Sequence, residues 1–197
     1  KTNVGGAINV IEASQDAGVK KVVALSTDKA FDPINAYGAS KLLAEKMFLA
    51  ANNTVPVGSI KYSVCRYGNV WASNGSVVPA WQRMIDAGAH SVPVSDPQVT
   101  RFYMTIEQAV DLVLQTLDTM PGEPVIPTLP AYRLGDLADA MGVLMDVRGL
   151  PHFEKRHEGM APGNASDLAR RMSVAELREK LAEIGFTPVQ KPLKSVA

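Results

Sequence analysis

Four side chains that can exchange protons lie close together in the first quarter of the chain. Asp28 and Lys29 belong to the segment S-T-D-K-A, and Tyr37 and Lys41 belong to the segment Y-G-A-S-K that follows it. Residues four positions apart on a helix lie on the same face, one turn apart. An ammonium group beside a phenol favours the phenolate, so this pair suits proton exchange near neutral pH. The two segments together indicate an active site.

Alternating helices and strands would position these groups. Apolar residues at helical spacing predict a helix over Val4–Ala17, and the apolar run Lys21–Ser26 is typical of a buried parallel strand. A helix from about Tyr37 to Ala51 and a strand over Ile60–Arg66 follow. This order of elements indicates an α/β fold with a doubly wound parallel sheet and right-handed crossovers.

The candidate site residues follow the predicted strands. Ser26–Lys29 comes directly after one strand, and Arg66–Val70 comes after the next. Ligands of an open parallel sheet bind beyond the carboxyl ends of its strands. We therefore expect both segments at the same edge of the sheet, with the helix that begins at Tyr37 beside them.

The composition of the chain changes beyond Val70, where Gly, Ser, Asn and Pro become frequent. We expect a small α+β lobe in residues 71–197. Its predicted elements are helices over Pro79–Ala87, Ile106–Leu117, Leu134–Val147 and Ser173–Ile184 and a short strand at Val125–Ile126. Thr105 is a predicted helix cap, and Ser173 and Glu176 have the spacing of a capping box.

The overall composition is that of a globular protein with no marked charge. Hydrophobic residues make up 46% of the 197 positions, charged residues make up 20%, and the formal net charge is zero. Nucleic acid and anionic membranes are therefore not expected as partners. Cys65, the one cysteine, lies in an apolar run and is expected to be a buried thiol in a reducing compartment. With no signal peptide and no apolar run of roughly 20 residues, we predict a cytoplasmic protein.

A metal site is the alternative that the histidines suggest. His152, Glu154, His157 and Glu158 place nitrogen and carboxylate groups within one short segment. Their spacing is not that of H-E-x-x-H, and no second cluster completes a coordination sphere. We expect no metal ion here.

The motifs resemble those of the extended short-chain dehydrogenase/reductase superfamily, in which Tyr37 and Lys41 match the Tyr-x-x-x-Lys pair. Within it, the chain is similar to the inverting UDP-N-acetylglucosamine 4,6-dehydratases and related capsule and flagellin-glycan enzymes. The matching segments are K-T-N-V-G-G-A-I-N-V-I-E-A, A-L-S-T-D-K-A, P-I-N-A-Y-G-A-S-K, R-Y-G-N-V, G-S-V-V-P and T-R-F. Sugar epimerases of the superfamily usually carry small hydroxyl residues in place of Thr27-Asp28-Lys29, a difference that favours dehydration.

The resemblance implies a fold and a reaction. Residues 1–70 would be the C-terminal part of a Rossmann-like dinucleotide-binding domain, and residues 71–197 would be mainly a substrate-binding lobe with interleaved Rossmann elements. Tyr37, assisted by Lys41, would take the C4 hydroxyl proton of a UDP-sugar while hydride passes to NADP or NAD. Lys29 would then remove the C5 proton, Asp28 would help water leave from C6, and hydride would return to C6. Thr27 would hydrogen-bond the C4 oxygen.

The resemblance also implies binding roles. Tyr37 and Lys41 would contact the cofactor as well as the sugar, and Val70 would lie against the nicotinamide. Asn69 would orient the substrate, as would Lys29. The substrate would also be contacted by Asn74, Val77, Arg101 and Glu154, and the guanidinium of Arg101 is suited to a diphosphate.

Several of these residues also have a purely structural interpretation. Asp28 and Lys29 could form an ordinary loop ion pair. Asn69 could only shape a turn, Arg101 could bridge a carboxylate, and Val77, like Val70, could pack in a core.

The chain departs from the family pattern at three places. Pro151, His152 and Phe153 stand where Arg-Pro-Gly precedes the family's E-K-x-H-E, and Asn74 replaces an arginine of G-S-R-G-S-V. The family's G-x-x-G-x-x-G turn is missing, since Gly5 and Gly6 fall inside a predicted helix. We therefore expect a C-terminal portion that does not bind a dinucleotide in the usual way and has an open sheet edge.

Three functions follow from this comparison of motifs. The first is a UDP-N-acetylglucosamine 4,6-dehydratase or a part of one, acting as a homo-oligomer. The second is a UDP-hexosamine 4-epimerase. The third is a non-catalytic domain that acts through association and retains the motifs as relics.

Overall fold

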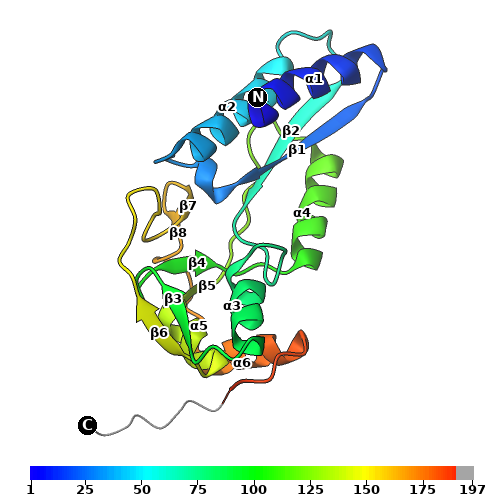
Figure 1. Cartoon of the computed structure of the whole chain (residues 1–197). Coiled ribbons are helices and arrows are strands. Elements are labelled where there is room, and N and C mark those ends of the chain that lie inside the picture. Colours follow the sequence, from blue (N-terminus) through cyan, green and yellow to red (C-terminus); the bar gives the residue numbers. More distant parts are fainter. Residues whose placement is uncertain (190–197) are drawn as a thin grey trace, which may run out of the picture. The chain divides into compact units, whose positions relative to one another are not determined.

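The computed structural model describes residues 1–189 and divides the chain into two compact units (Figure 1). Each unit is assembled from stretches that are separate in the sequence. Unit 1 consists of Lys1–Gly68, Met104–Thr128 and Gly159–Ala165, and unit 2 consists of Asn69–Tyr103, Leu129–Glu158 and the chain from Ser166 onward.

Unit 1 is a layered α/β structure. Its elements are α1 (Thr2–Asp16), β1 (Lys21–Thr27), the 3₁₀ turn η1 (Asp28–Ala30), α2 (Ala36–Ala51), β2 (Lys61–Tyr67), α4 (Ile106–Thr119), β7 (Gly159–Ala161) and β8 (Asn164–Ala165). β1 and β2 pair in parallel, from Lys21 opposite Lys61 to Thr27 opposite Tyr67. The helices α1 and α2 lie side by side on one face of this pair, and α4 packs against the other face (Figure 1). The predicted α/β fold with a parallel sheet is confirmed.

Local sequence explains where the helices of unit 1 begin. Asn35 caps α2, because its side-chain oxygen accepts a hydrogen bond of 2.9 Å from the backbone nitrogen of Gly38. Thr105 caps α4 as predicted, and it forms a capping box with Gln108. The core beneath α1 and α2 is formed by Ala7, Ala44, Phe48, Ala51, Ile60, Tyr62 and Val64.

The two strands of unit 1 differ in their surroundings. β2 also pairs with the segment around Val125, since Arg66 N donates to Val125 O at 2.9 Å and Val125 N donates to Val64 O at 2.8 Å. Within residues 1–189, β1 has β2 as its strand partner on one side alone. The prediction of a fully buried strand is therefore wrong for β1, where Leu25 is 49% exposed.

Unit 2 is an α+β structure around a larger apolar core. Its elements are α3 (Val77–Asp86), β3 (Ser91–Val94), β4 (Thr100–Phe102), β5 (Ala131–Arg133), α5 (Leu134–Met141), β6 (Leu144–Val147) and α6 (Val174–Glu183). β3 pairs in parallel with β6, and β4 pairs antiparallel with β5. The buried core includes Trp81, Val92, Val94, Val99, Leu137, Met141, Met172, Leu177 and Leu181. The predicted capping box of Ser173 and Glu176 at the start of α6 is confirmed.

The prediction of one helix over Leu134–Val147 is wrong. Helix α5 ends at Met141, and β6 begins at Leu144. Gly142 between them has φ +77°, a left-handed conformation that ends helices and favours glycine. A side chain there would also overlap the carbonyl oxygen of Val189. The apolar residues after Gly142 therefore continue as a strand that pairs with β3.

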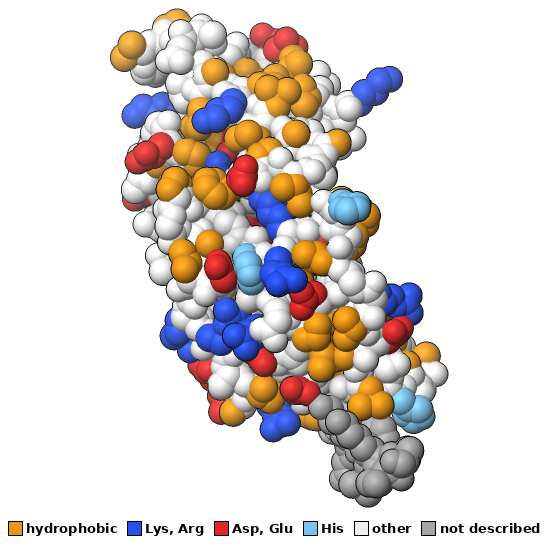
Figure 2. All heavy atoms as spheres, turned by 90° about the vertical axis from the view of Figure 1, so that its left-hand side faces the viewer, with side chains coloured by type: hydrophobic (Ala, Val, Ile, Leu, Met, Phe, Trp, Pro, Cys, Tyr) orange, Lys and Arg blue, Asp and Glu red, His pale blue; other side chains and the backbone are white. Residues whose placement is uncertain are grey.

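The exposed surface carries both signs of charge. On the face shown in Figure 2, lysine and arginine side chains alternate with aspartate and glutamate, as expected for a chain with zero formal charge. None of the helices over residues 1–189 combines the length and the apolar character that crossing a membrane requires.

Candidate active site

The carboxyl ends of β1 and β2 lie side by side in unit 1. Ser26 is opposite Arg66, and Thr27 is opposite Tyr67. The turn η1 begins directly after Thr27, so Asp28 and Lys29 lie at this edge of the sheet. The predicted position of Ser26–Lys29 at this edge is confirmed, and it is the edge at which parallel sheets commonly bind ligands.

Asp28 is buried, and its two carboxylate oxygens have different surroundings. Its side chain is 1% exposed. Oδ1 accepts hydrogen bonds from Thr27 Oγ1 at 2.7 Å and from Lys29 Nζ at 3.1 Å. Oδ2 is also buried and has no hydrogen-bond partner among the described residues. A buried, unpartnered carboxylate oxygen is costly in an ordinary loop ion pair, so this arrangement suits an atom that meets a substrate hydroxyl or water.

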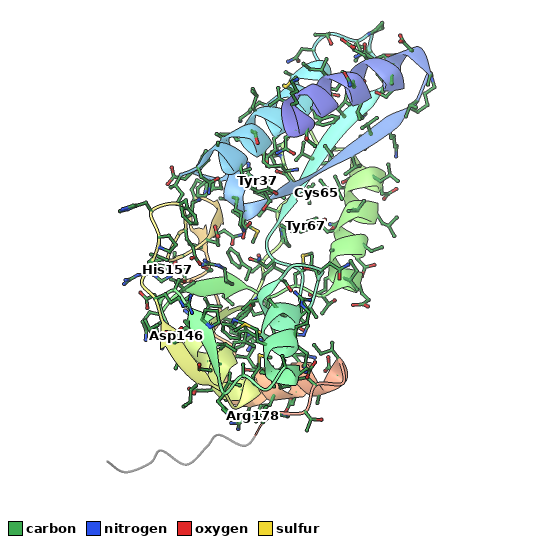
Figure 3. All side chains as sticks on the ribbon, in the orientation of Figure 1. Tyr37, Cys65, Tyr67, Asp146, His157 and Arg178 are labelled. Carbon is green, nitrogen blue, oxygen red and sulfur yellow. The ribbon has the colours of Figure 1, made fainter. Side chains whose placement is uncertain are left out.

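Tyr37 lies in the first turn of α2 and is 52% exposed (Figure 3). Lys41 lies one turn later on the same helix face, and its Nζ donates a hydrogen bond of 2.8 Å to Leu25 O of β1. The lysine therefore ties α2 to the sheet while Tyr37 remains accessible. This strand contact was not expected from the sequence, because it joins residues from two elements.

Gly38 brings the start of α2 against η1. A Cβ at this position would overlap the carbonyl oxygen of Lys29, so only glycine fits here without a shift. The turn that carries Tyr37 thus contacts the backbone of Lys29 directly. Sequence reasoning missed this role, although the glycine inside Y-G-A-S-K was a signal, because glycine is unfavourable inside a helix unless a close approach requires it.

Burial suppresses the ionisation of two further groups on β2 (Figure 3). Desolvation raises the pKa of the Cys65 thiol to about 11, partly opposed by a backbone hydrogen bond. Desolvation also raises the pKa of Tyr67, and the neighbouring Cys65 adds to the effect. The predicted burial of Cys65 is confirmed, and the thiol is too weakly ionised at neutral pH to act as a nucleophile.

Unit 2 gathers four of the residues assigned to substrate binding around one pocket. Asn69, Val77, Arg101 and Glu154 line a cavity of about 280 Å³, together with Trp81, Pro93, Ser95, Tyr132 and Leu134. Burial raises the pKa of Tyr132 to about 12, an effect that nearby Arg101 partly opposes, so its phenol stays neutral. Val70 and Asn74 do not line this cavity, and Asn74 is exposed.

Arg101 is held by a network of its own unit. Its Nη1 donates to Thr100 O at 2.8 Å and Lys155 O at 3.1 Å, and its Nη2 forms an ion pair with Glu154. Its Nε lies 4.0 Å from Glu158 Oε1. The guanidinium charge is thus met by two carboxylates, and a diphosphate would have to displace Glu154 to reach it.

The histidine segment joins a buried hydrogen-bond network in unit 2. His157 Nδ1 lies 2.8 Å from Thr100 Oγ1, which lies 2.6 Å from Ser166 Oγ (Figure 3). Over the described residues, no group of three or more His, Cys, Asp or Glu side chains has the arrangement of a metal site.

The chain matches a known family and named relatives. Residues 1–175 match the family described as polysaccharide biosynthesis protein. The chain is 44% identical over 171 residues to a UDP-N-acetylglucosamine 4,6-dehydratase (inverting) of Campylobacter jejuni, covering 85% of this chain and 51% of that protein. It is 39% identical over 166 residues to a UDP-glucose 4-epimerase of Rickettsia massiliae, covering 81% of this chain and 48% of that protein. The chain thus spans about half the length of these curated relatives.

Solved structures share the fold. Pen from Bacillus thuringiensis superposes with a TM-score of 0.83 at 29% identity, covering 94% of this chain and 69% of that one. DesIV, a dTDP-glucose 4,6-dehydratase from Streptomyces venezuelae, superposes with a TM-score of 0.67 at 17% identity, covering 95% and 61%. The second likeness concerns the fold alone.

Proposed function

Because the chain belongs to the polysaccharide biosynthesis protein family, we propose that it supplies the acid–base residues of a sugar-nucleotide 4,6-dehydratase that acts on UDP-N-acetylglucosamine. The observation that carries this proposal is the buried Asp28, which is paired with Lys29 and keeps one carboxylate oxygen unpartnered at the end of β1. The identity to the Campylobacter jejuni dehydratase supports the choice of reaction.

The cofactor in this proposal is NADP or NAD, and this chain fits one end of it. Tyr37 is accessible and Lys41 lies one turn away on α2, so these two residues would hold the nicotinamide end. The resemblance of the R-Y-G-N-V motif to the family adds Val70 to this assignment. The pyrophosphate end of a dinucleotide usually binds to a G-x-x-G-x-x-G turn, and this sequence contains no such turn. Its early glycines, Gly5 and Gly6, lie within α1. When bound, the cofactor would supply a hydride acceptor for C4 of the sugar and a hydride donor for C6.

The protein's own groups balance the protons of the elimination. Tyr37 in its phenolate form would take the proton of the C4 hydroxyl, with Thr27 beside the C4 oxygen. Lys29 takes the C5 proton, and Asp28 gives a proton to the hydroxyl that leaves C6 as water. Elimination consumes one proton at C6 and releases one at C5. When hydride returns to C6, C5 takes up one proton in place of the one that Lys29 removed, and the proton that Tyr37 took from the C4 hydroxyl replaces the one that Asp28 gave up. The contact of 3.1 Å between Lys29 Nζ and Asp28 Oδ1 keeps the base and the acid of this elimination adjacent.

The remaining assignments go with this reaction. The acid–base residues belong to residues 1–70, and the substrate contacts Asn69, Asn74, Val77, Arg101 and Glu154 belong mainly to residues 71–197. The lining of the unit 2 cavity by four of these residues supports a role in holding the nucleotide part. A homo-oligomer in the cytoplasm is part of the same proposal, and the buried free thiol of Cys65 suits a reducing compartment.

A 4-epimerase is the second candidate, favoured by the identity to the Rickettsia massiliae relative. Epimerisation needs Tyr37 and a hydride carrier but no elimination at C5 and C6. It therefore has no use for Asp28 and Lys29, which distinguishes the two functions by mutation.

The test combines this chain with the N-terminal half of the Campylobacter jejuni relative, NADP⁺ or NAD⁺, and UDP-N-acetylglucosamine. We expect a product that has lost one water, seen by mass spectrometry. Tyr37→Phe should abolish all turnover, whereas Asp28→Asn and Lys29→Met should abolish only the loss of water. A product of unchanged mass and altered C4 configuration would establish epimerisation instead. Absence of turnover in every combination would favour the non-catalytic domain.

A further inference from the structure

A buried ion pair joins α2 to the end of β2. Arg66 Nε donates to Glu45 Oε1 at 2.9 Å, and Arg66 Nη2 donates to Glu45 Oε2, which makes the pair bidentate. The two side chains are 9% and 2% exposed. A buried ion pair is a poor source of stability compared with apolar residues of the same volume. The bidentate geometry instead fixes the orientation of the two side chains relative to each other, which suggests a positioning role.

The same guanidinium reaches two further segments of unit 1. Arg66 Nη1 donates to Met160 O of β7. The guanidinium carbon also lies 5.9 Å from the centroid of the Phe31 ring, within the range of a cation–π contact. One arginine therefore connects α2, β7 and the residue that directly follows η1.

Phe31 transmits this contact to the acid–base turn. Its backbone nitrogen donates to Asp28 O at 3.1 Å and so closes η1. On another side, the ring packs against Gly159, where a Cβ would lie only 2.9 Å from Phe31 Cδ1. The Phe31 ring thus contacts both the Arg66 guanidinium and the backbone of β7, directly beside the hydrogen bond that closes η1.

Glu45 transmits the contact to Tyr37. Tyr37, Lys41 and Glu45 follow one another at intervals of four on α2, so they lie on one face of the helix. Lys41 is fixed to β1 through Leu25 O, and Glu45 is fixed to β2 through Arg66. The rotation of α2 about its axis, and with it the direction of Tyr37, is set at two points.

We propose that Glu45 and Arg66 are positioning residues that hold the Asp28–Lys29 turn and the Tyr37 helix in one fixed arrangement. Neither residue needs to touch the substrate, since Arg66 acts through Phe31 and Glu45 acts through α2. The role in catalysis rests on the proposed dehydration, whereas the positioning itself is a property of unit 1 that can be measured without substrate.

The first experiment replaces the pair by two methionines, Glu45→Met with Arg66→Met, and measures the unsubstituted chain alongside. The apolar pair is expected to keep the fold, as judged by circular dichroism and thermal melting. Hydrogen exchange of the peptide over residues 28–31 should become at least about tenfold faster, because η1 opens more often. The rate of Lys29 acetylation should rise toward that of the exposed Lys46 on α2, because the Lys29 side chain is held less firmly.

Two single variants keep the test decisive if the double variant does not fold. Arg66→Lys keeps the charge and loses the fork, and its matched control is Arg148→Lys in the exposed pair with Asp146. Phe31→Leu leaves the Glu45–Arg66 pair intact and removes the ring. Both variants should make hydrogen exchange over residues 28–31 faster, and the Arg148→Lys control should leave it unchanged.

Two outcomes overturn the proposal. One is a folded double variant with unchanged exchange and unchanged Lys29 acetylation, which makes the pair structural only. The other is a Phe31→Leu variant without effect on residues 28–31, which breaks the link from Arg66 to the turn. In the dehydration assay the positioning role predicts a lower kcat with little change in KM. Failure of that assay alone would contradict the proposed reaction and leave the exchange and acetylation results standing.

Discussion

The two units use their charged side chains in different ways. In unit 1, Tyr37 is half exposed, Lys29 is partly exposed and Asp28 keeps an unpartnered oxygen. In unit 2, the guanidinium of Arg101 is surrounded by two carboxylates and by carbonyl oxygens, and Glu158 is buried beside it. In the proposed reaction, access and unpartnered atoms would serve proton transfer in unit 1, whereas the closed network of unit 2 fixes the backbone around a cavity.

The hydrophobic cores of the two units also differ, in the size of the side chains that they bury. Unit 2 buries long side chains such as Leu137, Met141, Leu177 and Leu181 completely, whereas small alanines make up much of the core of unit 1.

The chain also carries a separate probe for each unit. Both tryptophans, Trp71 and Trp81, lie in unit 2, and the one cysteine lies in unit 1. Tryptophan fluorescence and thiol labelling therefore report on different units.

The largest expected effect comes from opening the closed network. Arg101→Met removes the cation that faces Glu154 and Glu158, and breaking a buried pair in this way costs about 3–5 kcal/mol of unfolding free energy. Urea titration followed by tryptophan fluorescence would show the loss as a lower midpoint for unit 2. Labelling of Cys65, which the raised pKa protects while unit 1 is folded, would show whether unit 1 follows.

Arg148→Met is the matched control for this variant. Arg148 is 68% exposed and pairs with Asp146 at the surface, so its loss should cost less than about 1 kcal/mol. Equal effects of the two variants would contradict the difference between a closed network and a surface pair.

A smaller effect is expected where α2 meets η1. Gly38→Ala forces the helix or the Lys29 backbone to shift, at a cost of roughly 1–3 kcal/mol, and should slow turnover because Tyr37 and Lys29 move apart. Stability would be measured from the Cys65 labelling midpoint. Gly5→Ala in α1 is the control, since nothing lies within 4 Å of a Cβ there, and it should gain about 0.5–1 kcal/mol. A Gly38→Ala variant as stable and active as the wild type would refute the close approach.

The smallest effect concerns the capping box of α6. The Ser173 backbone hydrogen bond, with help from Arg170 and the Ser173 hydroxyl, lowers the pKa of Glu176 to about 2. A lowered folded-state pKa gives stability that is present above the ordinary value of 4.5 and is lost as pH falls toward 2. Glu176→Gln should therefore lower the melting temperature slightly at neutral pH and not at all near pH 2. Glu179→Gln, which replaces a carboxylate of α6 outside the capping box, is the matched control.

Local signals predicted more of the molecule than distant contacts did. The caps at Thr105 and Ser173 are confirmed because a cap depends only on residues within one turn. The predicted helix over Leu134–Val147 is too long because β6 forms by pairing with β3, which lies far away in the sequence. The pairing of Glu45 with Arg66 is likewise invisible to periodicity, since it joins a helix to a strand.

Each unit is interleaved with the other along the chain, which passes between them after Gly68, Tyr103, Thr128, Glu158 and Ala165. A ribosome therefore releases β1, α2 and β2 long before β7 is made. The hydrogen bond from Arg66 Nη1 to Met160 O can form only after Met160 has been synthesised. Unit 1 is expected to reach its final structure only late in translation, after most of unit 2 has been synthesised.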